Sequence, residues 1–486
     1  MRKYFIMRIA FTAAAFVFIS SFLPSAKAES YLYDLKDRSA SVPDAYTVSQ
    51  VFTGEDFGTG RLSSPDDMFV DSKNRLYIAD TGNDRIVVLD SGFKLIKIID
   101  EVTADGQPSK LNQPKGVFAS GELIYIADTG NARVIAVDES GTAVRKLTRE
   151  GLFAVNENIE FQPEKVAADK DGGVFVVDRS IYQGIVQYDS GDRFIGFFAP
   201  NEVTVSAGVL ILNMWKNLFS DEQADSMEKT LPSPYSNVYI GTDGFVYASA
   251  SDAPDSRAIK QLNALGKNIL KSTGTADTKF GDLETSFEDG VEAFSRFSDV
   301  HVDESGIICG ADSRRGRLFL YDSYASPLAV FGGIGAYKGS FSKLTAVEKT
   351  GDSYIVLDGA KNTLTVFKPT EYFTKVREAL SFYNQGLYRD SAVLWKEVLH
   401  ENSNISVAYC GIGRAYLQDK EYKQAMTMLK EGGDTYFYSL AFKEYRKEFV
   451  RKYFVWILVG ITAFFILFAK TVKWLRQWML KGRTKS

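Results

Sequence analysis

Five aspartates stand at matching points of a recurring pattern, each directly after a short hydrophobic run: Asp80, Asp128, Asp178, Asp312 and Asp358. Carboxylates that converge from several segments can bind a divalent cation, so one hypothesis is a ring of oxygen ligands. The alternative is local, because an aspartate before Thr-Gly-Asn can hydrogen-bond the backbone of its own turn. Arg85 and Arg133 can each reach a neighbouring carboxylate. Since a repeated turn explains every position, we interpret these residues as structural.

Other residues that could do chemistry are few. The chain has two histidines and two cysteines, and it shows no nucleophile elbow, phosphate loop or zinc-binding spacing. We therefore predict no catalytic residue and no cofactor. His301 is the single histidine between residues 46 and 368, so a histidine-based metal site is not supported. A site built from oxygen ligands for a divalent metal such as calcium stays open.

A repeat governs the first two thirds of the chain. The segment 77–90 returns at 125–138 with nine of fourteen residues identical and an offset of 48 residues. Short alternating strands separated by Gly, Asn and Asp turns, with a period of about 40 to 50 residues, are typical of a β-propeller. Each repeat would then form one four-stranded blade. The sequence predicts a mainly β fold whose propeller occupies residues 46–368.

Six blades can be assigned, and the fourth has the weakest pattern, with an outer strand expected at 268–271. The sixth blade lacks an outer strand, because the sequence becomes helical after residue 368. An alternating segment at 46–52 stands unassigned before the first blade. We expect this N-terminal strand to complete the sixth blade, so that the ring closes and no sheet edge stays open.

The segments Asn-Gln-Pro-Lys-Gly-Val at 112–117 and Tyr-Ile-Ala-Asp-Thr-Gly-Asn-Ala-Arg-Val at 125–134 resemble the NHL repeat. The likeness extends over about residues 46–368. It implies a six-bladed propeller that most often serves as a recognition platform for proteins, peptides or other ligands. Some relatives and neighbouring propeller families are lyases or lactonases. The resemblance therefore implies recognition first, with an enzyme as the alternative.

Two insertions interrupt the period, at 199–234 and 272–294. Both fall between the outer strand of one blade and the inner strand of the next, on the face where propeller geometry also places the Asp-Thr-Gly-Asn turns. Long loops on a rigid scaffold often carry binding residues. The candidate binding residues on this face are Trp215, Phe219, Phe280, Phe287, Asn83 and Asn131. Alternatively, the apolar residues only attach the insertions to the body of the propeller.

Helical periodicity begins after the propeller and covers residues 371–433 in two copies. Tyr388 and Tyr422 occupy matching turns 34 residues apart, and Ala379 aligns with Gly413. This pattern resembles two tetratricopeptide repeats, a family that docks peptides or proteins in a concave groove. Because two repeats are few for a superhelix, a plain spacer is the alternative.

Both ends of the chain carry targeting signals. Residues 1–28 combine Arg2, Lys3 and Arg8 with an apolar run and Ala26-Lys27-Ala28, which predicts a cleaved signal peptide. An uncleaved anchor is the alternative. A linker is expected at 29–45 and a juxtamembrane helix at 435–452. The uncharged segment 453–469 predicts a transmembrane helix rather than a core helix, followed by a basic cytoplasmic tail at 470–486.

The charge distribution narrows the partners. Of 57 basic residues, four lie in 1–28 and six in 470–486, so residues 29–469 carry 47 against 61 acidic residues, a net charge of −14. An acidic domain does not suit nucleic-acid binding. The leading hypothesis is a recognition or scaffold protein of the cell membrane, with most of the chain outside the cytoplasm. Its protein partner would be a membrane or envelope complex. The alternative is a tethered propeller lyase or lactonase-type hydrolase with an oxygen-ligated metal in its channel.

Overall fold

The computed structural model describes residues 30–150, 152, 160–201, 233–251, 258–271, 279–283, 286–288 and 291–483. The chain divides into two compact units. The first contains the strands, and it also takes in the start of helix α4 (Glu371–Asn384) up to Arg377 and residues 398–405. The second contains most of the remaining helical residues.

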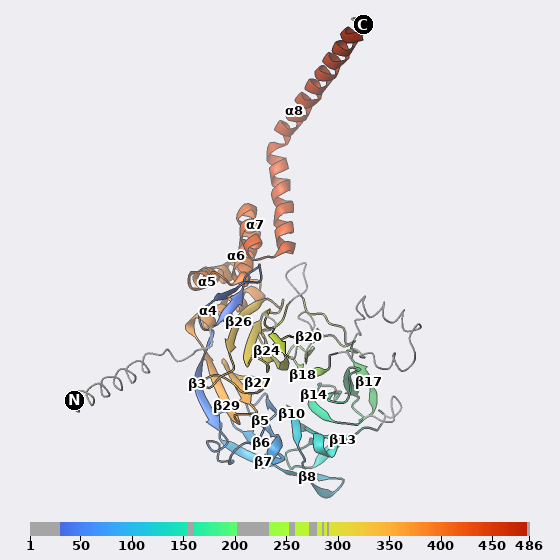
Figure 1. Cartoon of the computed structure of the whole chain (residues 1–486), viewed down its shortest axis with the longest axis vertical. Helices are drawn as coiled ribbons and strands as arrows, with labels where there is room; N and C mark the ends of the chain where they lie inside the picture. The colour runs from blue at the N-terminus through green and yellow to red at the C-terminus, as the bar shows by residue number, and fades with distance from the viewer. Residues whose placement is uncertain are drawn as a thin grey trace, which may run out of the picture. The chain divides into compact units, whose positions relative to one another are not determined.

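Six antiparallel sheets form a six-bladed β-propeller, which confirms the predicted fold (Figure 1). The first two blades are β4 (Asp67–Val70), β5 (Leu76–Asp80), β6 (Arg85–Leu89) and β7 (Leu95–Ile99), then β10 (Pro114–Ser120), β11 (Leu123–Asp128), β12 (Arg133–Val137) and β13 (Ala143–Leu147). Blades three and four are β14 (Pro163–Ala168), β15 (Val174–Asp178), β16 (Ile185–Tyr188) and β17 (Phe194–Phe198), then β18 (Tyr235–Ile240), β19 (Val246–Ala250) and β20 (Ile259–Leu262). Blade five is β23 (Phe297–Val302), β24 (Ile308–Asp312), β25 (Arg317–Tyr321) and β26 (Pro327–Gly332).

The sixth blade closes the ring with a strand from the start of the propeller. It consists of β27 (Leu344–Thr350), β28 (Ser353–Asp358), β29 (Thr363–Pro369) and β3 (Tyr46–Thr53). Strand β3 pairs antiparallel with β29, with Phe52 opposite Leu364, and the two lie side by side in Figure 1 in blue and orange. The predicted closure by an N-terminal strand is therefore confirmed.

Blade four differs from the expectation because its sheet has three strands. The outer strand predicted at 268–271 is wrong, since only an isolated bridge joins Leu262 and Asn268. The side-chain oxygen of Asn268 accepts hydrogen bonds from the backbone N–H groups of Gln261 and Leu270, at 3.2 and 3.1 Å. An asparagine side chain that accepts hydrogen bonds from the backbone competes with the regular ladder, which explains the short pairing.

Three small hairpins accompany the blades. Strands β8 (Glu101–Ala104) and β9 (Gln107–Lys110) lie between the first two blades, and β21 (Ser286–Glu288) and β22 (Val291–Ala293) lie in the second insertion. The third hairpin, β1 (Tyr31–Tyr33) with β2 (Ser39–Ser41), lies where a linker was expected at 29–45. Leu32 is buried and the hydroxyl of Tyr31 accepts a hydrogen bond from Arg317 at 2.9 Å. The segment is therefore folded, because three consecutive large side chains favour a strand.

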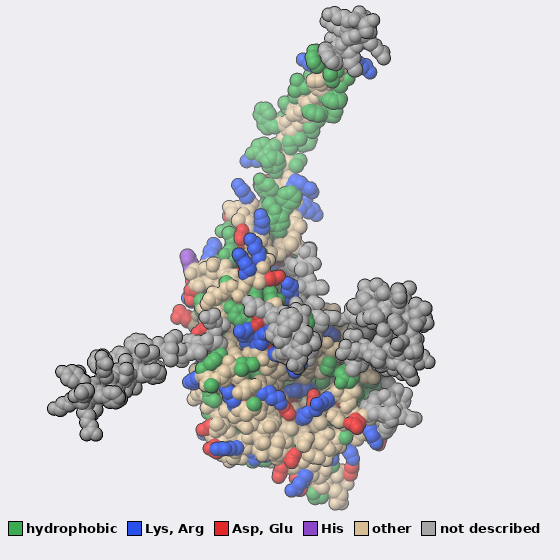
Figure 2. All heavy atoms as spheres, viewed as in Figure 1, with side chains coloured by type: hydrophobic (Ala, Val, Ile, Leu, Met, Phe, Trp, Pro, Cys, Tyr) green, Lys and Arg blue, Asp and Glu red, His purple; other side chains and the backbone are tan. Residues whose placement is uncertain are grey.

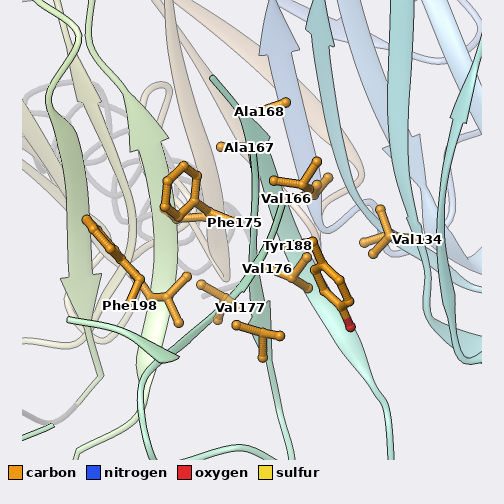
Figure 3. Packing of buried hydrophobic residues seen from close by; sticks show 14 of the residues in the cluster. Val134, Val166, Ala167, Ala168, Phe175, Val176, Val177, Tyr188 and Phe198 are labelled. Atoms are coloured by element: carbon orange, nitrogen blue, oxygen red, sulfur yellow. The ribbon is translucent and has the colours of Figure 1, made fainter. Parts of the chain in front are cut away.

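The core of the propeller lies between neighbouring blades. Strands β5, β12 and β15 are buried along their whole length, since neighbouring sheets cover both of their faces. In blade three, Val166, Val176 and Tyr188 pack toward Val134 of blade two, while Phe175 contacts Phe198 with ring centroids 5.0 Å apart (Figure 3). Burial on both sides makes each blade depend on its neighbours.

Two helical hairpins follow the propeller: α4 with α5 (Tyr388–Glu401), and α6 (Ser406–Gln418) with α7 (Tyr422–Glu431). A Cβ atom on Gly411 would lie 2.4 Å from Nε1 of Trp395, and one on Gly413 would lie 2.6 Å from Cγ of Leu429. These glycines therefore allow α6 to pack closely against α5 and α7.

The last helix, α8 (Thr435–Arg483), continues without a break through the two segments that were expected as a juxtamembrane helix and a span. It is the one helix of the described residues that is long and apolar enough to cross a membrane, by length and composition.

Candidate functional site

The repeated aspartates hold together two connections in five of the six blades. Each side chain accepts a hydrogen bond, at 2.5 to 3.1 Å, from a backbone N–H in the segment that leads into the inner strand. The donor and acceptor pairs are Ser63 with Asp80, Asn112 with Asp128, Gln162 with Asp178, Arg296 with Asp312 and Ser342 with Asp358. The second-strand turn and the loop before the inner strand are thus linked five times by the same contact.

These carboxylates accept further hydrogen bonds in one of two arrangements. In blade one, Asp80 accepts from Nδ2 of Asn83 and from Nε of Arg85, both at 2.8 Å. Blade two repeats this arrangement with Asp128, Asn131 and Arg133. In blades three, five and six, the aspartate instead accepts the backbone N–H two residues later, from Ser180, Arg314 and Ala360. Each contact is structural, and no group of three or more His, Cys, Asp or Glu suited to a metal occurs among the described residues.

Asp178 differs electrostatically from the aspartates of the first two blades. The position five residues after Asp80 and Asp128 is an arginine, whereas Gln183 stands five residues after Asp178. Burial raises the pKa of Asp178 to about 7, although its hydrogen bonds from Ser180 and Gln162 oppose the shift. This carboxyl group therefore binds a proton near neutral pH.

A second set of equivalent residues lies on the inner strands. The strand registers match one position in each blade: Asp67, Gly116, Lys165, Asn237, Asp299 and Ala346. Nζ of Lys165 lies 2.5 Å from Oδ1 of Asp67, so this pair connects blade three directly to blade one. The equivalent position of blade two, between them, is Gly116. Asp299 accepts a hydrogen bond from the side chain of Asn237, which connects blades five and four. The innermost positions therefore carry polar links between blades.

The same two carboxylates also bind the backbone of the next blade. Asp67 accepts the N–H of Val117 at 3.0 Å, and Asp299 accepts the N–H of Val347 at 2.7 Å. Burial raises the pKa of both carboxyl groups, and that of Asp299 to about 7, while the positive charge of Lys165 acts against the rise. Lys165 thus stabilises two buried carboxylates.

Gly116 allows this arrangement. A Cβ atom at this position would lie 2.5 Å from the backbone oxygen of Glu164 and 3.0 Å from Cα of Lys165. The absence of a side chain therefore lets β10 approach β14 closely, which carries Lys165 toward Asp67.

Two residues further along the inner strands, aromatic and ionisable groups meet. Phe69 and Phe118 have ring centroids 4.5 Å apart, and the rings of Tyr239 and His301 are 5.0 Å apart. Nδ1 of His301 lies 3.0 Å from Oε2 of Glu348, and both residues are buried. Burial raises the pKa of Glu348 and the proximity of His301 lowers it. Cys309, also buried, lies opposite His301 in the strand register, and no group of three or more His, Cys, Asp or Glu suited to a metal occurs among the described residues.

The candidate binding residues are not brought together as a site. Trp215 and Phe219 lie outside the described residues, and Phe287 lies in β21, whose side chains are not described. Phe280 corrects the expectation of an exposed contact, because it is buried and packs edge to face on Tyr321 with centroids 5.0 Å apart. The alternative role, attachment of the insertion to the propeller, fits this residue.

The two asparagines of the turns are exposed, but their side chains are engaged. Nδ2 of Asn83 also donates to the backbone oxygen of Arg61, and Nδ2 of Asn131 donates to that of Lys110. Both amides therefore brace the turn against the preceding loop, which is a structural role.

The set of equivalent residues on the inner strands was not identified from the sequence. Its members lie 12 or 13 residues before the last residue of the second strand, so an alignment on the second-strand aspartates would have found five of the six. The sequence signal for this set is weak because residues of several different types occupy the six positions. Their ion pair and hydrogen bonds form only when the folded blades bring the side chains together.

The helical unit has a polar link of its own. The guanidinium of Arg414 lies 3.8 Å from the ring centroid of Phe437 and 4.8 Å from that of Tyr383. Its Nη2 lies 3.5 Å from Oδ2 of Asp434. Because these residues belong to α4, α6 and the beginning of α8, the hairpins and the start of α8 form one packed group.

No protein-family model and no curated protein matches the chain. Several solved structures show a weak similarity to the chain. A virginiamycin B lyase from Staphylococcus aureus has 8% identity and a TM-score of 0.39, covering 67% of this chain and 100% of its own. The Malassezia sympodialis allergen Mala s 1 has 13% identity and a TM-score of 0.39, covering 63% and 93%. An extracellular domain of a hybrid two-component system from B. thetaiotaomicron has 12% identity and a TM-score of 0.36, covering 62% and 33%. These low values do not support the transfer of an activity to this chain.

Proposed function

We propose that the protein is a membrane-anchored recognition or scaffold protein with its propeller outside the cytoplasm and its helical hairpins docking a membrane or envelope protein. The observation that carries the proposal is the unbroken helix α8, which begins within the packed hairpins and continues through the apolar stretch 453–469. A partner bound to the hairpins would therefore be held at a fixed distance from the membrane.

The polar chemistry of the propeller supports a scaffold role. The repeated aspartates and the inner-strand charges are engaged by contacts within the fold, so they stabilise the body rather than present reactive groups. The likeness to NHL and tetratricopeptide repeats, two families devoted mostly to binding, agrees with this role.

The outward location rests on the signal-like residues 1–28 and the basic tail 470–486. Cys309 and Cys410 are both buried, so an engineered surface cysteine can be labelled selectively. Ser91→Cys, at an exposed turn of blade one, should react with a membrane-impermeant maleimide in cells whose outer envelope is permeable. Ser486→Cys should react only after the inner membrane is lysed. The reverse pattern would refute the proposed topology.

Docking is tested by a charged residue on the hairpins. Val393, in α5, is 60% exposed, and Leu265, in blade four of the propeller, is 79% exposed. We expect cross-linked affinity purification from native membranes to recover a stoichiometric partner with the wild type and with Leu265→Arg, and to lose it with Val393→Arg. Recovery that is the same for all three, or absent from the wild type, would count against docking through α5.

A further inference from the structure

The flank of α8 that precedes the apolar stretch carries a basic cluster, here defined as Lys443, Arg446, Lys447, Arg451 and Lys452. All five side chains are exposed, and residues 443–452 include only two acidic residues, Glu444 and Glu448. Of these five side chains, Lys447 alone forms an ion pair with a described residue, Glu444, at 2.6 Å. The cluster therefore presents a net positive surface.

In the proposed topology, this basic cluster lies on the exported side of the membrane, which opposes the usual positive-inside bias. Lysine and arginine near a span are favoured on the cytoplasmic side and disfavoured on the exported side. In the proposed topology the tail already supplies the cytoplasmic charge, so the cluster weakens the asymmetry that sets orientation. An interaction on the outer side would account for these charges.

Aromatic residues occupy a separate face of the same segment. Tyr445 and Phe449 have ring centroids 6.4 Å apart, and Phe449 and Tyr453 have centroids 4.8 Å apart. Their spacing of four residues aligns them along the helix, whereas Lys443, Lys447 and Arg451 follow one another at the same spacing on another face. Aromatic and basic side chains next to an apolar span are typical of a helix segment at the interface between membrane and water.

The length of the apolar stretch places the end of the cluster nearest to residue 453 at the headgroups. The 17 residues 453–469 rise by about 1.5 Å each, so they span roughly 25 Å, less than the ~30 Å of a hydrocarbon core. Flanking residues are therefore drawn into the interface, where lysine and arginine extend their charged ends toward water and aromatic rings settle. Figure 2 shows the hydrophobic side chains of α8 with Lys and Arg at both ends of the apolar region.

We propose that the basic cluster binds the headgroups of anionic phospholipids in the outer leaflet of the membrane that α8 crosses. The proposal rests on the membrane anchoring stated above. Charge complementarity selects anionic over zwitterionic lipid, and the neighbouring aromatic face positions the cluster at the depth of the phosphates. Each Lys or Arg at an anionic surface contributes roughly five-fold in affinity.

The test uses the full chain in vesicles of phosphatidylcholine mixed with phosphatidylglycerol, in which one lipid at a time is brominated. Bromine quenches nearby tryptophan, and Trp456 lies just inside the cluster. Trp474→Phe and Trp478→Phe remove the two tryptophans at the opposite flank. The ratio of quenching by the two brominated lipids gives the relative binding of phosphatidylglycerol.

We expect a preference of at least five-fold for phosphatidylglycerol at 0.1 M salt, weaker at 0.5 M salt because these charges are exposed. Replacing all five cluster residues by Gln should bring the ratio to about one. A control with the same charge change should keep the preference; it replaces by Gln five exposed lysines of the first compact unit, Lys36, Lys73, Lys94, Lys110 and Lys338.

Two results would overturn the proposal in different ways. Equal quenching by both lipids in the parent protein, or a preference unchanged by the cluster variant, would reject lipid selectivity and leave the anchor intact. No quenching by either brominated lipid would show that α8 is not in the bilayer, which would reject the membrane anchoring as well.

Discussion

Replacing Lys165 by Met removes the positive charge that links the inner strands of blades one and three while it nearly preserves the shape of the side chain. The variant leaves Asp67 and Asp299 buried without a cation, since Lys165 is the charge that lowers the pKa of both. Removing one partner from a buried ion pair typically costs about 3 to 5 kcal/mol. We expect a loss of that size in the free energy of unfolding at pH 8.

The pH dependence distinguishes charge from shape. The folded-state pKa of Asp299 is already raised to about 7 with Lys165 present, so without it the carboxyl groups bind protons still more readily. A carboxyl group whose pKa is higher in the folded state stabilises the fold while it is protonated, and this stability is lost as pH rises through the folded pKa. The cost of Lys165→Met should therefore be smaller at pH 5 than at pH 8.

The assay is urea unfolding of the full chain in detergent, followed by circular dichroism of the strands at both pH values. Lys115→Met is the matched control, because Lys115 forms a more exposed ion pair with Glu164, at 2.6 Å. An exposed pair is worth about 0 to 1 kcal/mol, so this control should change little. Loss below about 1 kcal/mol for Lys165→Met, or a loss that does not depend on pH, would refute the reasoning.

Three further outcomes follow from single positions. Gly116→Ala should destabilise the propeller by about 1 to 3 kcal/mol in the same assay, because its Cβ would overlap backbone atoms, whereas Gly92→Ala, which meets only a side-chain oxygen at 3.3 Å, should be tolerated. The pKa of Asp178 is raised to about 7, so the free energy of unfolding of the wild type should fall between pH 5 and pH 8 by more than that of Asp178→Asn. The same pH dependence of stability in both proteins would contradict this. Gly411→Ala should expose the helical hairpins to limited proteolysis, since the added methyl group would overlap Trp395; unchanged cleavage rates would argue against that close contact.

The fold was predictable because its signals are repeated. Hydrophobic runs that end in aspartate, spaced by turns, recur often enough that even the degenerate third blade can be placed, and the unpaired segment at 46–52 then has one place left to pair. Blade four shows where this reasoning fails. The side chain of Asn268 accepts hydrogen bonds from the backbone N–H groups of Gln261 and Leu270, and competition of this kind leaves no trace in hydrophobic periodicity.

The polar links near the axis were not predictable, because they join residues that are far apart in the chain. Lys165 and Asp67 are separated by 98 residues, and Asn237 and Asp299 by 62. Each is an ordinary strand residue when it is seen alone. Their pairing depends on the number of blades between them and on a glycine in the intervening blade, and neither of these is a property of the local sequence.

Closure and the inner links favour placing the proposed recognition role on surfaces and helices rather than on the inner strands. Strand β3 reaches its partner β29 across more than 300 residues, so the ring is complete only after the whole propeller has been synthesised. Once closed, blades one and three and blades four and five are held by buried polar contacts whose loss is costly. A ligand that entered between these strands would have to replace those contacts, whereas a partner bound to the helical hairpins would leave them intact. The stability of the ring and the proposed docking role therefore require different parts of the chain.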